Sequence, residues 1–382
     1  MPRLKTLYFA LFLSLLSSCK VDFKNDWTLL SPAPVTTEHF ESLKRILADK
    51  SHNIYSLGTL SKMNPHEDFA YITKSTAEGK WLWSIPLQCT NGPSEMLASD
   101  IINEQLIVAM NQCLVALNLD GKVIWETAFD QILEINDLKI LQNTIYVLGK
   151  RFEAFSLDGN LLFSEELEEH LWSIQEHDQL IYIAGSGKIK TYKRGEDSLR
   201  TLIHFPNYAP PAQLLFGENQ TIYAAFFNAQ SDHVTLIALT LPGRLLWKKS
   251  FKNADFNSPN LPAAPLLDQM SNQLVLSLSK YGHREILLIN KSNGHLIKKE
   301  KNKHGIIRQS LVLENKVLAV FGERTLDFLD ENLELFASYN IPYDALVTSG
   351  DFLVENNALY LGASILREGS FRFYLARFSL KQ

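Results

Sequence analysis

One hairpin pattern recurs along this chain and restricts the folds open to it more than any other feature. Each copy begins with a polar residue and a short apolar strand. The first apolar positions are residues 54, 106, 145, 180, 222, 274, 317 and 359, which lie 35 to 52 residues apart. A variable loop and a second strand follow, and then a tight turn such as Asp120-Gly121 or Asp158-Gly159. Self-similarity at periods of this size is typical of repeat architectures.

The turns and the residues after them predict what holds the copies together. Gly or Asn stands in each turn because tight hairpin turns need a residue with positive φ; the last turn, Glu331-Asn332, has no Gly. Four residues after the turn, five of the seven copies carry a large aromatic residue, which we expect to pack as a wedge between neighbouring units. The structural residues predicted in this way are Gly121, Trp125, Gly159, Gly243 and Trp247.

Four strands fit into each copy, which predicts an all-β chain folded as a β-propeller of four-stranded blades. Eight strand starts but only seven post-turn strands are visible, so the last blade lacks an outer strand. Residues 26–30 can supply that strand from the N-terminus, which would close the ring and cover both sheet edges. Eight blades are therefore favoured. Seven blades are the alternative, with the hairpin from Ile54 to Ser75 as a spare.

The N-terminus has the pattern of an export signal. Arg3 and Lys5 precede an apolar segment that is too short for a confident membrane-spanning helix. Residues 16–19, Leu-Ser-Ser-Cys, resemble the bacterial lipobox, in which the peptide is cut before the Cys and the Cys is acylated. We expect a signal peptide over 1–18, a lipid-anchored tether over 19–25 and one propeller domain over 26–382, with Cys19 as the attachment site. A plain signal peptide with a chance Cys is the alternative.

The hairpin LVALNLDGKVIW, with Ala five residues before Gly and Trp four after it, resembles the repeats of pyrroloquinoline-quinone-type propellers. Ala116, Ala154 and Ala238 occupy the small position, which in that family lets one blade pack on the next. A lipobox with an eight-bladed propeller also resembles, in architecture, the lipoprotein B-subunit family of the outer-membrane β-barrel assembly machinery. This resemblance implies a protein-binding scaffold. Lys20 replaces the Asp that retains bacterial lipoproteins at the inner membrane, which favours an outer-membrane location.

Charge and motifs argue against several function classes. The net charge is −5, and removal of residues 1–18 leaves 35 basic against 42 acidic residues, or −7, so nucleic acid is not an expected partner. The ten His residues lack zinc-site spacing, and no nucleophile, phosphate-loop or calcium-loop motif stands out. The adjacent Cys pair common in quinone-dependent dehydrogenases is missing. We expect no catalytic residue, no metal and no cofactor.

Binding is expected on one face of the ring. Connections between the second and third strands share a face with the links between blades, and they are predicted to be long in blades one, five, six and eight; neutral loop drift is the alternative. The candidate rim residues are Lys62, Asp68, His233, Tyr281, Arg284 and Arg367. We expect a monomer that binds an envelope protein, or, as the second choice, a small molecule or glycan in the central funnel.

Cys89 and Cys113 are the remaining cysteines. An exported protein can form a disulfide, so these two residues are a candidate pair. Free Cys is usually a small buried apolar residue, and two unpaired thiols are the alternative.

Overall fold

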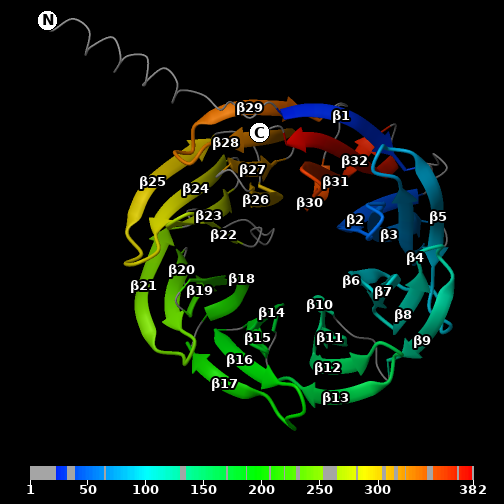
Figure 1. Cartoon of the computed structure of the whole chain (residues 1–382), viewed down its shortest axis with the longest axis horizontal. Coiled ribbons are helices and arrows are strands. Elements are labelled where there is room, and N and C mark those ends of the chain that lie inside the picture. Colours follow the sequence, from blue (N-terminus) through cyan, green and yellow to red (C-terminus); the bar gives the residue numbers. More distant parts are fainter. Residues whose placement is uncertain are drawn as a thin grey trace, which may run out of the picture.

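The structure, a computed structural model, describes residues 23–31, 39–63, 66–129, 135–168, 171–185, 187–205, 208–218, 220–228, 233–252, 265–280, 283–302, 307–313, 317–322, 324–341, 347–367 and 370–380. Within these residues every regular element is a β-strand, and the strands are arranged as a ring (Figure 1). They form six four-stranded sheets and one eight-stranded sheet.

Each four-stranded sheet runs in chain order from the centre of the ring to its outside (Figure 1). Unit 2 comprises β6 (Met96–Ile102), β7 (Gln105–Met110), β8 (Cys113–Asn118) and β9 (Val123–Ala128). Unit 3 comprises β10 (Asp137–Leu141), β11 (Thr144–Leu148), β12 (Arg151–Ser156) and β13 (Leu161–Glu166). Unit 4 comprises β14 (Ser173–His177), β15 (Leu180–Gly185), β16 (Lys188–Lys193) and β17 (Arg200–His204).

Three further sheets follow the same order. Unit 5 comprises β18 (Tyr208–Gly217), β19 (Thr221–Asn228), β20 (His233–Thr240) and β21 (Leu245–Lys252). Unit 6 comprises β22 (Leu266–Met270), β23 (Gln273–Lys280), β24 (His283–Asn290) and β25 (Leu296–Asn302). Unit 7 comprises β26 (Gln309–Leu313), β27 (Val317–Phe321), β28 (Thr325–Leu329) and β29 (Leu335–Asn340).

The eight-stranded sheet brings the two ends of the chain together. Unit 1 is its first half, with β2 (His39–Ala48), β3 (Ile54–Met63), β4 (His66–Ser75) and β5 (Trp81–Leu87). Unit 8 is its second half, with β30 (Val347–Glu355), β31 (Ala358–Arg367), β32 (Ser370–Leu380) and, outside β32, the N-terminal strand β1 (Phe23–Leu30). The pairing between the halves is one parallel bridge between Phe40 and Phe371.

The core lies between the units. Apolar residues of neighbouring sheets form eight buried clusters, one at each junction described, including the junction of unit 8 with unit 1. In that last cluster Leu43, Ile46 and Tyr71 of unit 1 contact Tyr360 and Phe373 of unit 8. Because each junction buries apolar side chains from both partners, every unit is held by two neighbours, and the ring has no apolar end.

Two kinds of turn lie on one side of the ring, the turn face. In units 2, 3, 4 and 8 the turns between first and second strands place two residues at positive φ, such as Asn356 and Asn357, as the commonest two-residue hairpin turns require. The turns before the outer strands place one residue there, for example Gly159 at φ 79°. In the last of these turns we expected Asn332 to take this conformation, but Leu333 does so, at φ 58°. The opposite side, the loop face, carries the other connections.

Candidate functional site

Four units have second and third strands that extend further toward the loop face. In units 1 and 8 these strands contain 10 to 11 residues, and in units 5 and 6 they contain 8. In units 2, 3, 4 and 7 they contain 5 or 6. The same four units were predicted to carry long loops. Most of the extra residues continue the strands instead, because the added backbone groups pair across the hairpin.

The tall hairpins of units 1 and 8 stand side by side and form a hairpin wall (residues 59–63, 66–70, 363–366 and 370–373). Near its tip, level with Ser61 and Leu366, the rings of Phe40 and Phe371 lie 5.9 Å apart, beside the parallel bridge that joins the two units. At its tip the side chain of Met63 is 52% exposed. Lys62 lies beside it, with Nζ 4.6 Å from the centre of the Phe69 ring and 3.8 Å from a Glu67 carboxylate oxygen. The tip of the wall thus exposes an apolar residue flanked by charged residues.

A buried carboxyl group fixes the base of the hairpin wall. Glu41 on β2 is 2% exposed, and its Oε2 accepts hydrogen bonds from Ser31 Oγ at 2.5 Å and from the backbone N–H of Phe373 at 2.6 Å. Burial raises the pKa of Glu41, although these two hydrogen bonds and the charge of Arg372 act in the opposite direction. Glu41 therefore links β1, β2 and β32 where the two chain ends meet.

The structure places the predicted rim residues in different environments. Lys62 and Asp68 lie in the hairpin wall, and Asp68 Oδ2 is 3.8 Å from His66 Nε2. His233 begins β20, opposite Lys252 of β21. Tyr281 lies outside the described residues, as does the side chain of Arg367, whose backbone ends β31 opposite Ser370.

The prediction for Arg284 was wrong. Its side chain is 3% exposed, and its guanidinium donates to the Asp327 carboxylate of unit 7. Ser338 Oγ donates to the other Asp327 oxygen at 2.5 Å. A buried, paired Arg has little to offer an external partner, so this residue joins two units.

The recurring aromatic residues lie against the turn of the next unit. The indole Nε1 of Trp125 donates to Leu157 O at 2.9 Å, and the ring packs so closely on Gly159 that a Cβ there would lie 2.7 Å from Trp125 Cε3. Trp247 makes the same kind of contact with unit 6, through Lys291 O at 2.8 Å. The predicted turn residues Gly121 and Gly243 also face the preceding unit, at Ile85 and Leu202 respectively. These residues connect neighbouring units.

Trp27 of β1 shows the same contact at the junction of the chain ends. Its Nε1 donates to Ala77 O at 3.2 Å, and its ring covers Gly79 of unit 1. The N-terminal strand therefore carries an aromatic residue that plays, for unit 8, the part that Trp125 and Trp247 play for units 2 and 5.

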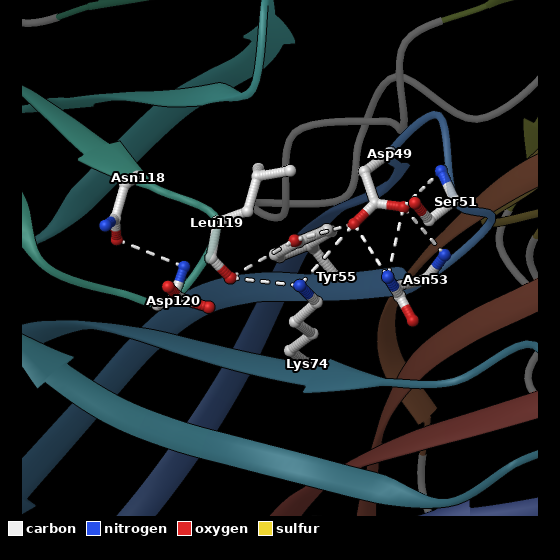
Figure 2. A network of polar contacts seen from close by, with 8 residues as sticks. All are labelled: Asp49, Ser51, Asn53, Tyr55, Lys74, Asn118, Leu119 and Asp120. Atoms are coloured by element: carbon white, nitrogen blue, oxygen red, sulfur yellow. Dashed lines mark hydrogen bonds and ion pairs between the residues drawn. The ribbon is translucent and has the colours of Figure 1, made fainter.

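At the junction of units 1 and 2 the corresponding turn carbonyl, Leu119 O, accepts a hydrogen bond from the lysine of a buried ion pair (Figure 2). Lys74 Nζ lies 3.5 Å from Asp49 and donates to Leu119 O at 3.0 Å, and the two charged side chains are 9% and 3% exposed. Asp49 also accepts hydrogen bonds from Asn53 and, at 3.0 Å, from Tyr55 Oη. Burial raises the pKa of Asp49, but these hydrogen bonds and the Lys74 charge outweigh it and lower the pKa. The network ties three segments of unit 1 to the turn of unit 2.

Sequence reasoning missed a set of side-chain to backbone bonds around the centre of the ring. An oxygen of one inner strand accepts the backbone N–H of the next inner strand at 2.6 to 3.0 Å. The five pairs are Asp100 with Ile140, Asp137 with Ile174, Gln213 with Leu267, Asp268 with Val312 and Asp351 with Ile46. Burial raises the pKa of Asp137, Asp268 and Asp351. The sequence does mark this set: an Asp stands six or eight residues before the first apolar position in four of the repeats.

A cavity of about 250 Å³ opens at the centre, between the inner strands of units 4 to 8. Polar atoms of Gln175, Gln213, Asp268 and Gln309 line it, together with Phe216 and Phe352. Both carboxylate oxygens of Asp268 already accept backbone N–H groups, at 2.7 and 2.6 Å. Among the described residues no group of three or more His, Cys, Asp or Glu side chains could hold a metal ion.

Cys89 and Cys113 form a disulfide with a Cα–Cα distance of 5.9 Å. It attaches the link between units 1 and 2 to the start of β8, next to the loop face. The predicted lipid-attachment residue, Cys19, lies outside the described residues. In the part of the chain that the structure describes, no helix is long and apolar enough to cross a membrane.

The fold was compared with known proteins. A scan against models of protein families finds no match, and no curated protein sequence matches. Solved structures do match. BamB from Moraxella catarrhalis is similar over 94% of this chain and 98% of its own, with a TM-score of 0.65 and 11% identity. The WD40 domain of Neurospora crassa Pan2 covers 96% and 98%, with a TM-score of 0.55 and 10% identity.

A third similar structure is virginiamycin B lyase from Staphylococcus aureus, which covers 75% of this chain and 95% of its own, with a TM-score of 0.52 and 13% identity. At these identities the likeness shows the fold alone. The chain is a β-propeller.

Proposed function

We propose that this protein is an exported, lipid-anchored β-propeller that binds another envelope protein through its hairpin wall. In this proposal the eight units are the blades of one ring, and β1 completes the last blade. The pairing of β1 with β32 and the contact of Trp27 with Gly79 support that closure. Cys19 carries the acyl chains, and the protein acts as a monomeric, non-enzymatic scaffold at the outer membrane.

The observation that carries the proposal is the uneven height of the loop face. Units 1 and 8 raise their hairpins beside each other, and Met63 at the tip is 52% exposed while charged residues surround it. A rigid ring below and a paired sheet within the wall keep these side chains in place, which lowers the ordering cost of binding. A role in outer-membrane protein assembly agrees with the lipobox resemblance and with the fold shared with BamB.

The partner can be tested by crosslinking in intact cells, followed by recovery of the protein from native membranes. Recovery of a β-barrel assembly component from the unaltered chain is the expected result. Met63→Asp should abolish that crosslink, because a carboxylate would replace the exposed apolar tip. Val354→Asp is the matched control, since Val354 is 40% exposed but lies at the turn-face end of β30. Equal recovery from both variants would refute docking at the hairpin wall.

Lipidation needs a separate test. Cys19→Ala should move the protein from the membrane fraction to the soluble fraction after cell lysis, and the mature chain should lose its acyl mass. Unchanged fractionation together with an unmodified N-terminal residue would contradict the anchor.

The central cavity supports a second candidate function, the binding of a small polar molecule or glycan. Amide side chains and nearby Phe rings are common in sugar sites, and Gln175, Gln213 and Phe352 line the space of about 250 Å³. Native mass spectrometry of protein purified from membranes would show a bound molecule of constant mass. Gln175→Leu should remove it, whereas Met63→Asp should not.

A further inference from the structure

The direction of β1 fixes which face of the ring lies near the N-terminal tether. β1 is antiparallel to β32, with Phe23 opposite Leu380 and Leu30 opposite Tyr374. In β32 the residues near Leu380 pair with the start of β31, beside the turn at Asn356. Phe23 therefore lies at the turn face. Cys19 precedes it by only four residues, which span at most about 14 Å when extended. A lipid on Cys19 would bring the turn face toward the bilayer and leave the hairpin wall pointing away.

Exposed apolar pairs follow the turns on that same side. β9, β13, β21, β25 and β29 each begin with two large apolar residues that are 38 to 55% exposed. In β21 the pair is Leu245 and Leu246, at 44% and 50%, and in β25 it is Leu296 and Ile297, at 47% and 50%. These five strands lie on the outside of the ring (Figure 1).

These outer strands occupy equivalent positions in their units but differ in charge. β21 and β25 are adjacent around the ring and contain six lysines, at positions 248, 249, 252, 298, 299 and 301, against one acid, Glu300. Lys299 and Lys301 share the buried Glu285 of β24, at 2.8 and 3.6 Å. In β13 the equivalent pair, Leu161 and Leu162, is followed by Glu165 and Glu166 and by no lysine. Lys298 also lies 4.0 Å from Glu334 of unit 7. Even with these pairs, lysines outnumber acids along this edge of a chain whose net charge is −5.

We propose that this basic edge, residues 245–252 and 296–301, rests on an anionic phospholipid surface. Aliphatic side chains beside lysines suit the boundary of a bilayer, where apolar groups enter the interface and ammonium groups meet lipid phosphates. The rest of the ring carries a net negative charge, which an anionic surface repels, whereas this edge carries an excess of lysines. The inference deepens the proposed function and rests on its lipid anchor for the orientation: Cys19 and the basic edge would hold the ring at two places.

The test uses the mature chain, residues 19–382, with Cys19→Ala, so that binding reports the edge and neither the lipid nor the apolar signal segment. Co-sedimentation is measured with vesicles of phosphatidylethanolamine and phosphatidylglycerol, and with phosphatidylcholine vesicles. Binding is expected only to the anionic vesicles and should weaken with salt. Lys248→Glu with Lys298→Glu should reduce binding by about tenfold or more, because each reversal replaces an attraction to lipid phosphates with a repulsion.

Leu245→Ser with Leu246→Ser should also reduce binding, and Leu161→Ser with Leu162→Ser is the matched control at the same repeat position. Equal effects of the two apolar pairs, or equal binding to both vesicle types, would overturn the proposal. A salt-sensitive dimer in sedimentation velocity that the lysine reversals abolish, without vesicle binding, would assign the edge to contact between copies instead. Failure of the anchor alone would appear differently: the edge would still bind vesicles, but Cys19→Ala would leave cellular fractionation unchanged.

Discussion

Gly159→Ala should destabilise the ring far more than Gly195→Ala, although both glycines occupy outer turns at positive φ. Gly159 has φ 79° and Gly195 has φ 86°. An L-residue in this region costs about 1–2 kcal/mol, so both substitutions share that term. They differ in their surroundings, because a Cβ on Gly195 would meet no atom within 4 Å.

A Cβ on Gly159 would lie 2.7 Å from Trp125 Cε3 and 2.8 Å from Thr127 Oγ1. Both side chains would have to move, which costs about 1–3 kcal/mol in a packed contact. The movement also disturbs two hydrogen bonds, Trp125 Nε1 to Leu157 O at 2.9 Å and Thr127 Oγ1 to Gly159 O at 2.8 Å, each contributing about 1 kcal/mol. We therefore expect a loss of about 1–2 kcal/mol for Gly195→Ala and about 3–5 kcal/mol for Gly159→Ala.

Equilibrium unfolding in urea, followed by the fluorescence of the tryptophans, measures both losses. Trp125→Phe in each background adds a second check: replacing the clashing indole with a smaller ring should narrow the difference in unfolding free energy between the two Ala variants. If the two glycine variants lose the same stability to within about 0.5 kcal/mol, close to the scatter expected for independent sites, the packing of the aromatic residue on the next turn does not stabilise the ring.

Three further predictions concern the junctions between units. Lys74→Met should lower the free energy of unfolding, measured in urea, by about 2–3 kcal/mol. This is somewhat less than the ~3–5 kcal/mol typical of broken buried ion pairs, because Asn53 and Tyr55 still donate to Asp49. An unchanged free energy of unfolding would contradict a stabilising role for the pair. Glu41→Gln should become more stable relative to the unaltered chain as the pH rises from about 4 toward 7. The pKa of Glu41 is raised in the folded state, so its ionisation destabilises the fold in that range. A difference in unfolding free energy that stays constant across these pH values would refute this. Trp27→Ala should release β1 to limited proteolysis while units 2 to 7 remain protected; cleavage spread evenly over the chain would argue against a docked N-terminal strand.

Much of the fold could be predicted from the sequence because its signals are local. A glycine at positive φ and an aromatic residue four positions later need only the geometry of one hairpin, as at Gly159 and Phe163. Counting strands predicted that residues 26–30 would lie beside the last strand of the chain, and β1 pairs with β32. Periodicity in the chain thus identified the repeating unit before any contact between units was known.

The candidate site was harder to predict, since polar residues at the loop face look alike in sequence whether they lie in a loop or in a strand. Lys280 and His283 end the strands of a paired hairpin, although their composition suggested an irregular connection. Arg284 is the clearest case, because its partner Asp327 is 43 residues away in the next unit. Only the packing of two sheets brings them together, and no spacing within one repeat could indicate it.

Leu333 shows how tertiary packing overrides a local preference. Asn tolerates positive φ better than Leu does, which favoured Asn332 for the turn. The hydrogen bonds of the turn, however, match those of its glycine-containing counterparts: Leu333 N donates to Asp330 O at 2.9 Å, as Gly121 N donates to Asn118 O at 3.0 Å. Leu333 is also 2% exposed in the cluster between units 6 and 7. Burying a leucine contributes about 1.5–3 kcal/mol, enough to offset the ~1–2 kcal/mol cost of its backbone conformation. The outer turns of units 1, 2, 3, 5 and 7 therefore share one hydrogen-bond pattern, and in unit 7 the packing of the neighbouring unit selects a leucine where the other four turns have glycine.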